Sequence, residues 1–156
     1  MDEFGRIIAG KVAVAGVGRV DRGDDGFGPR LVAALAGVEA LDAVDCGDRP
    51  EDFTAEILRS SPDTVLIADA VEMGASPGEV ALIESGGLPA GCGGTHRASL
   101  GTLMKYLEWR GGARVLLLAV QPGTIADGPG LSPEVAASLD RLARALARGA
   151  GRRPGS

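Results

Sequence analysis

The sequence predicts an α/β protein, a three-layer α/β/α sandwich around a mostly parallel, twisted sheet of about five strands. Short apolar runs alternate along the chain with stretches in which apolar residues recur at helical spacing. The short runs are apolar throughout, which is typical of strands that helices cover on both faces. The length of 156 residues predicts a single domain over 1–148, and the Gly/Arg/Pro-rich tail 149–156 is expected to be disordered.

Each element follows from its own pattern of residues. Strands are expected at 11–16, 40–46, 63–68, 78–84 and 114–120, and the last is the most hydrophobic. Helices are expected at 29–35, 51–59, 99–109 and 133–148, with Ser132 as the N-cap of the last and Pro133 in its first turn. The link that precedes 78–84 is too short to hold a crossover helix, so this strand is expected to run antiparallel to its neighbour.

Composition and charge exclude several classes of protein. A net charge of −5 argues against a general nucleic-acid binder, which needs a basic surface for phosphate. No stretch is long and apolar enough to span a bilayer, and residues 1–6 contain no apolar secretion signal, so a cytoplasmic location is expected. Cys46 and Cys92 are far apart and are expected to be free thiols in a reducing compartment. We expect a monomer in solution.

Three residues that could act in catalysis or metal binding lie in or beside loops that connect to the expected sheet. Asp25 follows the first strand, Asp69 ends the third, and His96 is the only histidine of the chain. In open parallel sheets, ligands bind beyond the carboxyl ends of the strands, where the strand order reverses. Asp25 and Asp69 can therefore come together although they are far apart in sequence. Two carboxylates and an imidazole are a set that binds divalent metal ions.

Other interpretations of these segments stay open at this point. The pair Gly16 and Gly18 after a strand suggests a dinucleotide-binding turn, but Asp21 replaces the third glycine of that motif. Asp24 and Asp25 could form a solvated turn with a helix N-cap, and Asp69 could be a structural cap at a strand end. Cys92 and His96 could form a thiol–imidazole pair. A single histidine excludes zinc sites of the His-x-x-x-His type.

Around these residues the chain resembles the hydrogenase maturation endopeptidases, over roughly residues 11–146. Five motifs match in order: Gly16-Val17-Gly18 with Asp24 to Pro29, then Asp45-Cys46-Gly47, then Ile67 to Ala70 with Pro77-Gly78-Glu79, then Thr95-His96 with Leu100, and last Val120-Gln121-Pro122 with Leu131 to Val135. The resemblance implies an aspartic-type endopeptidase that removes the C-terminal extension from the large-subunit precursor of a nickel–iron hydrogenase.

The same resemblance implies roles for individual residues. Asp25, Asp69 and His96 match the metal-binding residues of the family, which we take as catalytic, and Asp24 matches a neighbouring acid that is not a ligand. Nickel is expected to arrive with the precursor and to serve as the recognition element. Zinc or cadmium could take its place in a crystal. The alternatives are a non-catalytic module that checks nickel during hydrogenase assembly and a small nucleotide-binding α/β protein.

Two residues depart from the family pattern. Arg19 stands where the family usually has Asn, and Cys46 stands where it usually has Gly. Arg19 is expected at the rim of the cleft, where a charge tunes the choice of partner. The other interpretation is that Arg19 pairs with Asp21 or Asp24 and stiffens the loop.

Overall fold

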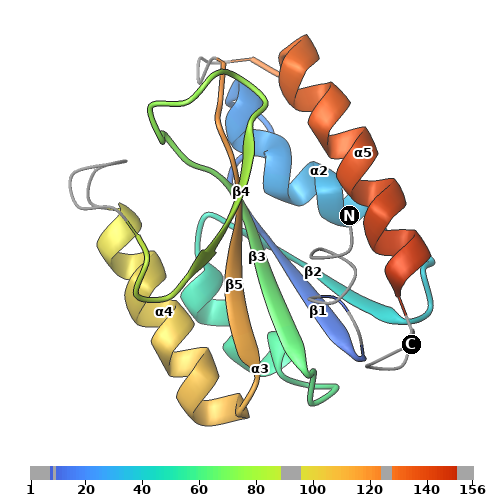
Figure 1. The fold of residues 1–156 in the computed structure, drawn as a ribbon, viewed down its shortest axis with the longest axis vertical. Coiled ribbons are helices and arrows are strands. Elements are labelled where there is room, and N and C mark those ends of the chain that lie inside the picture. Colours follow the sequence, from blue (N-terminus) through green and yellow to red (C-terminus); the bar gives the residue numbers. More distant parts are fainter. Residues whose placement is uncertain (1–7, 9, 89–95, 124–127, 151–156) are drawn as a thin grey trace.

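The fold is seen in a computed structural model, which describes residues 8, 10–88, 96–123 and 128–150, and the side chains of all of these except 96–99. Five strands form one sheet (Figure 1). They are β1 (Val12–Val17), β2 (Leu41–Gly47), β3 (Thr64–Ala70), β4 (Val80–Glu84) and β5 (Arg114–Val120). Their order across the sheet is β2-β1-β3-β5-β4, and only β4 runs antiparallel to its neighbour. The predicted fold class, including the antiparallel strand, is confirmed.

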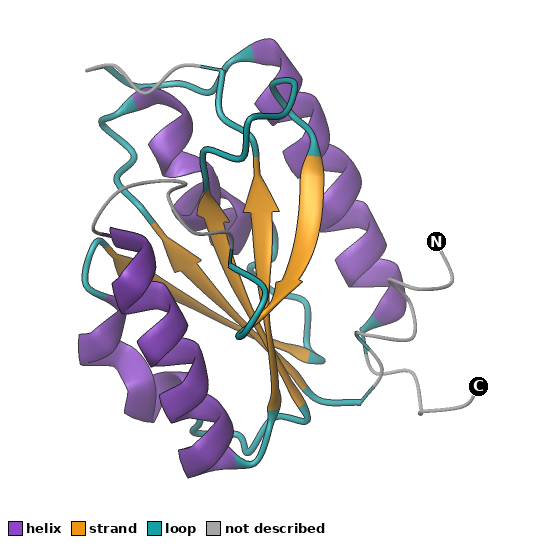
Figure 2. Cartoon of the chain, turned by 60° about the vertical axis from the view of Figure 1, so that its left-hand side comes forward, coloured by secondary structure: helices purple, strands orange, loops and turns teal. Residues whose placement is uncertain are grey.

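Helices cover both faces of this sheet, as Figures 1 and 2 show. One face carries α2 (Phe27–Ala34) and α5 (Pro133–Gly149), and the other carries α3 (Thr54–Ile57) and α4 (His96–Gly111). The 3-10 helices η1 (Gly23–Gly26) and η2 (Pro50–Phe53) precede α2 and α3. Among the described helices, none is long and apolar enough to cross a membrane.

The structure corrects some of the expected helix bounds. The single helix expected at 51–59 is divided into η2 and α3, because Phe53 has φ −117° and ψ 12° and so interrupts regular helical geometry. Helix α4 begins at His96, three residues earlier than expected, and this places the only histidine in its first turn. Helix α5 extends to Gly149, while 151–156 lie outside the described residues, so disorder of the tail remains a prediction.

The two faces of the sheet bury separate aliphatic cores. Phe27 and Leu31 of α2 pack with Leu146 of α5 against one face, and Met104 and Leu107 of α4 pack against the other. The side chains of β1, β3 and β5 enter these cores alternately, which is why these strands are apolar at most positions, with Thr64, Asp69 and Arg114 as the exceptions. By contrast, the two large aromatic side chains of α4 lie outside the core: Trp109 is 80% exposed, and its ring centroid is 6.1 Å from that of Tyr106.

Glycines let three backbone segments touch at the carboxyl end of the sheet. A Cβ atom on Gly28, in the first turn of α2, would lie 2.4 Å from the carbonyl oxygen of Ala68 in β3. It would also lie 2.4 Å from the amide nitrogen of Val17 in β1. A Cβ atom on Gly16 would meet the Gly28 carbonyl oxygen at 2.4 Å. These contacts hold the start of α2 directly on the ends of β1 and β3.

We therefore expect Gly28→Ala to destabilise the protein by at least about 3 kcal/mol, because the methyl group would press on backbone atoms that cannot rotate away. Gly86→Ala is the matched control, since nothing lies within 4 Å of the added Cβ atom. It should change the unfolding free energy by less than about 0.5 kcal/mol. Urea denaturation followed by circular dichroism measures both variants. Equal stabilities for the two variants would show that the backbone contact is not restrictive.

Candidate active site

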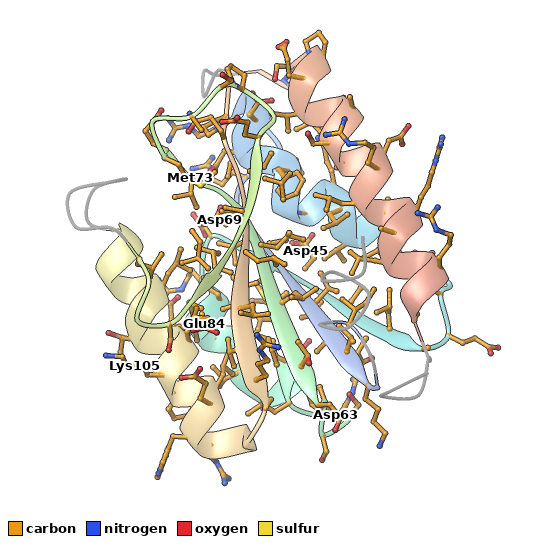
Figure 3. The ribbon with its side chains drawn as sticks, viewed as in Figure 1. Asp45, Asp63, Asp69, Met73, Glu84 and Lys105 are labelled. Carbon is orange, nitrogen blue, oxygen red and sulfur yellow. The ribbon has the colours of Figure 1, made fainter. Side chains whose placement is uncertain are left out.

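The site lies at the switch point of the sheet, where two successive connections leave in opposite directions. Strands β1 and β3 are neighbours, with Gly16 paired to Ala68, while β2 lies on the other side of β1. The connection after β1 contains Asp25. Asp69 is the penultimate residue of β3, which ends at Ala70. Figure 3 shows Asp69 at this edge, near Met73, with Asp63 at the opposite end of the sheet. The predicted location at the carboxyl edge is therefore confirmed for these two residues.

Asp69 is a buried carboxyl group, with only 2% of its surface exposed. Burial raises its pKa well above the ordinary value, and the negative charge of Asp25 raises it further. A hydrogen bond from the Ala70 backbone N–H acts in the opposite direction and is the smaller influence. The group thus favours its neutral form in this environment. A divalent cation beside Asp69 would stabilise the ionised form instead.

Asp25 is fixed by the loop that precedes it. Its Oδ2 atom accepts the backbone N–H of Arg19 at 2.9 Å. Gly18 has φ +135°, and a Cβ atom there would lie 1.9 Å from the Asp25 carbonyl oxygen, so the loop can fold back on η1 only with glycine at this position. The backbone contacts of Gly16 and Gly18 account for the Gly-x-Gly pattern without a bound phosphate.

Asp24 lies in a buried group of polar atoms at the start of α5. It has no exposed surface, and it accepts hydrogen bonds from the backbone N–H groups of Gly123 at 2.7 Å and Ser132 at 2.6 Å. The Ser132 hydroxyl also donates to it, at 2.8 Å. The interpretation of Asp24 as part of a solvated turn is therefore wrong. Ser132 occupies the predicted N-cap position of α5, but its hydroxyl binds Asp24 rather than the helix.

His96 is described only through its backbone. Helix α4 ends just before β5 begins, so its first residue lies toward the carboxyl edge of the sheet. The His96 side chain, like all of Cys92, lies outside the described residues. Within the part of the chain that is described, no three His, Cys, Asp or Glu side chains group as a metal site. Convergence of Asp25, Asp69 and His96 therefore stays a prediction.

The two departures from the family pattern have different environments. The Arg19 guanidinium donates to both carboxylate oxygens of Asp21, from Nε at 3.1 Å and from Nη2 at 2.9 Å. Both side chains are exposed, at 51% and 63%, so this ion pair should contribute little to stability. Cys46 is buried in the core beneath α3 and α4, and burial raises the pKa of its thiol to about 12. Cys46 thus packs in the core at a position where the family pattern usually has glycine.

Gln121 is a polar residue of the site that sequence reasoning left without a role. It directly follows β5 and is 3% exposed. Its Oε1 atom accepts the backbone N–H groups of Met73 at 2.7 Å and Ala75 at 3.2 Å, in the segment that follows Asp69. The signal was present in the sequence, since a glutamine that closes a fully apolar strand must find buried partners.

Comparison with known proteins gives one consistent family. The family model of hydrogenase maturation protease matches residues 29–148, which is more than half of the chain. The chain is 32% identical to the hydrogenase 3 maturation protease of Escherichia coli over 112 residues, or 70% of this chain and 71% of that protein. It is 29% identical to a putative hydrogenase maturation protease of Methanocaldococcus jannaschii, over 87% of this chain and 86% of the relative.

Solved structures agree in fold. The crystal structure of a hydrogenase maturation protease from Thermococcus kodakarensis superimposes with a TM-score of 0.84 at 24% identity, covering 94% of this chain and 97% of that one. The crystal structure of the hydrogenase 3 maturation protease gives a TM-score of 0.76, covering 95% of this chain and 99% of that one. At 24% sequence identity this likeness is one of fold.

The raised pKa of Asp69 predicts how stability depends on pH. The folded protein keeps the Asp69 proton at pH values where the unfolded chain, with a pKa near 3.8, has lost it. The stability gained from this proton is complete below the unfolded pKa and is lost as pH rises through the raised folded pKa. Asp69→Asn cannot lose a proton, so its unfolding free energy should rise relative to that of the wild type as pH increases above the unfolded value of 3.8 and through the raised folded pKa.

Urea denaturation across this pH range measures the effect, with Asp25→Asn as the control. Removing the Asp25 charge leaves the burial of Asp69 intact, so this control should flatten the pH dependence only in part. Parallel curves for Asp69→Asn and the wild type would mean that Asp69 ionises normally in the folded protein.

Proposed function

The chain belongs to the hydrogenase maturation protease family, and on this basis we propose that it removes the C-terminal extension from the large-subunit precursor of a nickel–iron hydrogenase, acting in the cytoplasm as a monomer. One observation carries the proposal at the level of chemistry: a carboxyl group buried to 2% exposure lies within electrostatic reach of a second carboxylate at the switch point. Such a pair is unfavourable without a cation and becomes favourable with one.

The cation in this proposal is the nickel of the substrate. Asp25 and Asp69 offer hard oxygen atoms, and His96 would add an imidazole nitrogen, a donor set that suits Ni²⁺ without strong selectivity over Zn²⁺. The three side chains leave coordination positions open, which the thiolates of the precursor or a water molecule could fill. An open site of this kind favours a metal that arrives with the precursor over one held permanently.

The raised pKa of Asp69 gives a physical reason for checking the precursor before cleavage. With a precursor that lacks nickel, nothing would offset the burial and the Asp25 charge that raise the pKa of Asp69, and nothing would bridge the two carboxyl groups. A precursor with nickel would favour the ionised form of Asp69 and be held by two carboxylates at once. The scissile peptide would then be positioned only in the loaded precursor, so an empty large subunit would keep its extension.

Incubation with nickel-loaded and nickel-free precursor tests this proposal. We expect mass spectrometry to show release of the C-terminal peptide only from the loaded precursor. Asp69→Asn and His96→Ala should each slow this release by about 100-fold or more, because each removes one metal-binding group. Asp48→Asn, which removes an exposed carboxylate from the loop after β2 whose charge acts on Arg19 in the loop after β1, is the control and should cleave normally.

Two results would contradict the proposal. Wild-type protein that binds the loaded precursor without changing its mass would instead indicate a non-catalytic nickel-checking module. Equal cleavage of loaded and empty precursor would exclude nickel as the recognition element.

Arg19 provides a test of partner choice. Because Arg19 is exposed at the edge of the site and paired with Asp21, we expect Arg19→Asn to change the competition between cognate and non-cognate precursors. Single-turnover cleavage of bound precursor should stay within about threefold of the wild type. Asp21→Asn is the matched control, since it releases the Arg19 side chain but keeps its charge. Unchanged preference in Arg19→Asn would leave the ion pair with a structural role alone.

A further inference from the structure

We propose that the connection between β5 and α5 is a brace that fixes the spacing of Asp25 and Asp69, with Gln121 and Asp24 as its positioning residues. The brace is defined by the described residues of this connection that bind both site loops: Gln121, Gly123, Gly128 and Ser132. The geometry of the brace stands on its own contacts, and its consequence for cleavage rests on the function proposed above.

On the β3 side, Gln121 holds the segment that follows Asp69. Its Oε1 atom accepts two backbone N–H groups, from Met73 and Ala75, and its Nε2 atom donates to Glu72 at 3.0 Å and to the Pro122 carbonyl at 3.2 Å. The side chain thus uses both its donors and its acceptor. The backbone of Gln121 also binds this segment, because the Gly78 N–H donates to the Gln121 carbonyl at 2.8 Å.

On the β1 side, the same connection holds the loop that carries Asp25. Gly123 and Ser132 donate to the buried Asp24 carboxylate, which is adjacent to Asp25 in sequence. Gly128 pairs with the loop through its backbone, donating to the Asp21 carbonyl at 2.8 Å and accepting from the Gly23 N–H at 2.9 Å. Among the described residues, five hydrogen bonds therefore join this loop to the brace.

The position of these contacts argues for more than general stability. Gln121 binds the segment that follows Asp69, while Gly123 and Ser132 of the same connection bind Asp24, the neighbour of Asp25 in sequence. An amide side chain that satisfies several backbone groups at once leaves the loop few alternative conformations. A displacement at either end of the brace should change the separation of Asp25 and Asp69, on which shared binding of one cation depends.

Ser138 offers a matched control for Gln121. Its buried hydroxyl donates to the Gly78 carbonyl, so it binds the same β3–β4 connection but at the end away from Asp69. Gln121→Met and Ser138→Ala each remove buried hydrogen bonds to this connection and should both lower the melting temperature. Only Gln121→Met removes the contacts beside Asp69.

The experiment measures cleavage of nickel-loaded precursor and amide hydrogen exchange for both variants. We expect Gln121→Met to lower kcat by about 10–100-fold with KM within about threefold, and Ser138→Ala to keep kcat within about threefold. Gln121→Glu keeps the acceptor oxygen but places a carboxylate against Glu72, so kcat should fall. Adding Glu72→Gln restores a donor–acceptor pair and should recover most of the loss.

On the other side of the brace, Ser132→Ala removes one of the hydrogen bonds that Asp24 makes with described residues. This variant is milder than Asp24→Asn, which could unfold the chain. Because both ends set one spacing, the effects of Ser132→Ala and Gln121→Met on kcat should be non-additive. Losses of kcat that simply follow the losses of melting temperature in all variants, Ser138→Ala included, would overturn the brace.

Hydrogen exchange separates failure of the brace from failure of the proposed function. The amides of Met73 and Ala75 should exchange at least about tenfold faster in Gln121→Met than in the wild type. If the wild type cleaves no precursor but this acceleration is seen, the proposed function fails and the brace stands. If the exchange rates are unchanged, the brace is wrong whatever the activity.

Discussion

Direct backbone contact at the switch point is the constraint on which the rest of this structure depends. The start of α2 lies so close to β1 and β3 that a Cβ atom on Gly28 would be 2.4 Å from the Ala68 carbonyl oxygen. A side chain at this position would push η1, and with it Asp25, away from the strand that carries Asp69. The electrostatic influence of Asp25 on Asp69 exists because two glycine backbones can touch where ordinary residues cannot.

This closeness has an energetic consequence that the surrounding structure must offset. A carboxyl group as buried as Asp69 is costly to ionise, and a second carboxylate nearby increases that cost. The fold compensates elsewhere, with two aliphatic cores and with polar residues such as Asp24 and Gln121 whose hydrogen bonds are well satisfied. The site therefore combines carboxyl groups that lower the stability of the chain with neighbouring polar residues that raise it. This combination is common in functional sites.

The fold was predictable because its signals are local, whereas the polar contacts around the site are not local. Uniformly apolar strands predicted a covered sheet, and one short link predicted the antiparallel β4. The N-cap rule placed Ser132 correctly but could not predict its hydrogen bond, since Asp24 is 108 positions away in sequence. The location of Asp25 and Asp69 at the carboxyl edge of the sheet could be predicted from topology. The burial of Asp24, in contrast, follows from a long-range contact that no pattern of neighbouring residues encodes. The pairing of Arg19 with Asp21, two positions apart, was an alternative that the sequence itself offered.

The exposed Trp109 on α4 has a consequence for spectroscopy. It is the only tryptophan of the chain, and 80% of its surface is in contact with solvent in the folded protein. Its indole ring will be surrounded by water both before and after denaturation, so the emission wavelength should hardly shift when the chain unfolds. The same indole, with Tyr106 at a centroid distance of 6.1 Å as an energy donor, is sensitive to any molecule that covers the outer surface of α4. Intrinsic fluorescence of this protein is therefore a reporter of contacts on that helix and a poor reporter of folding.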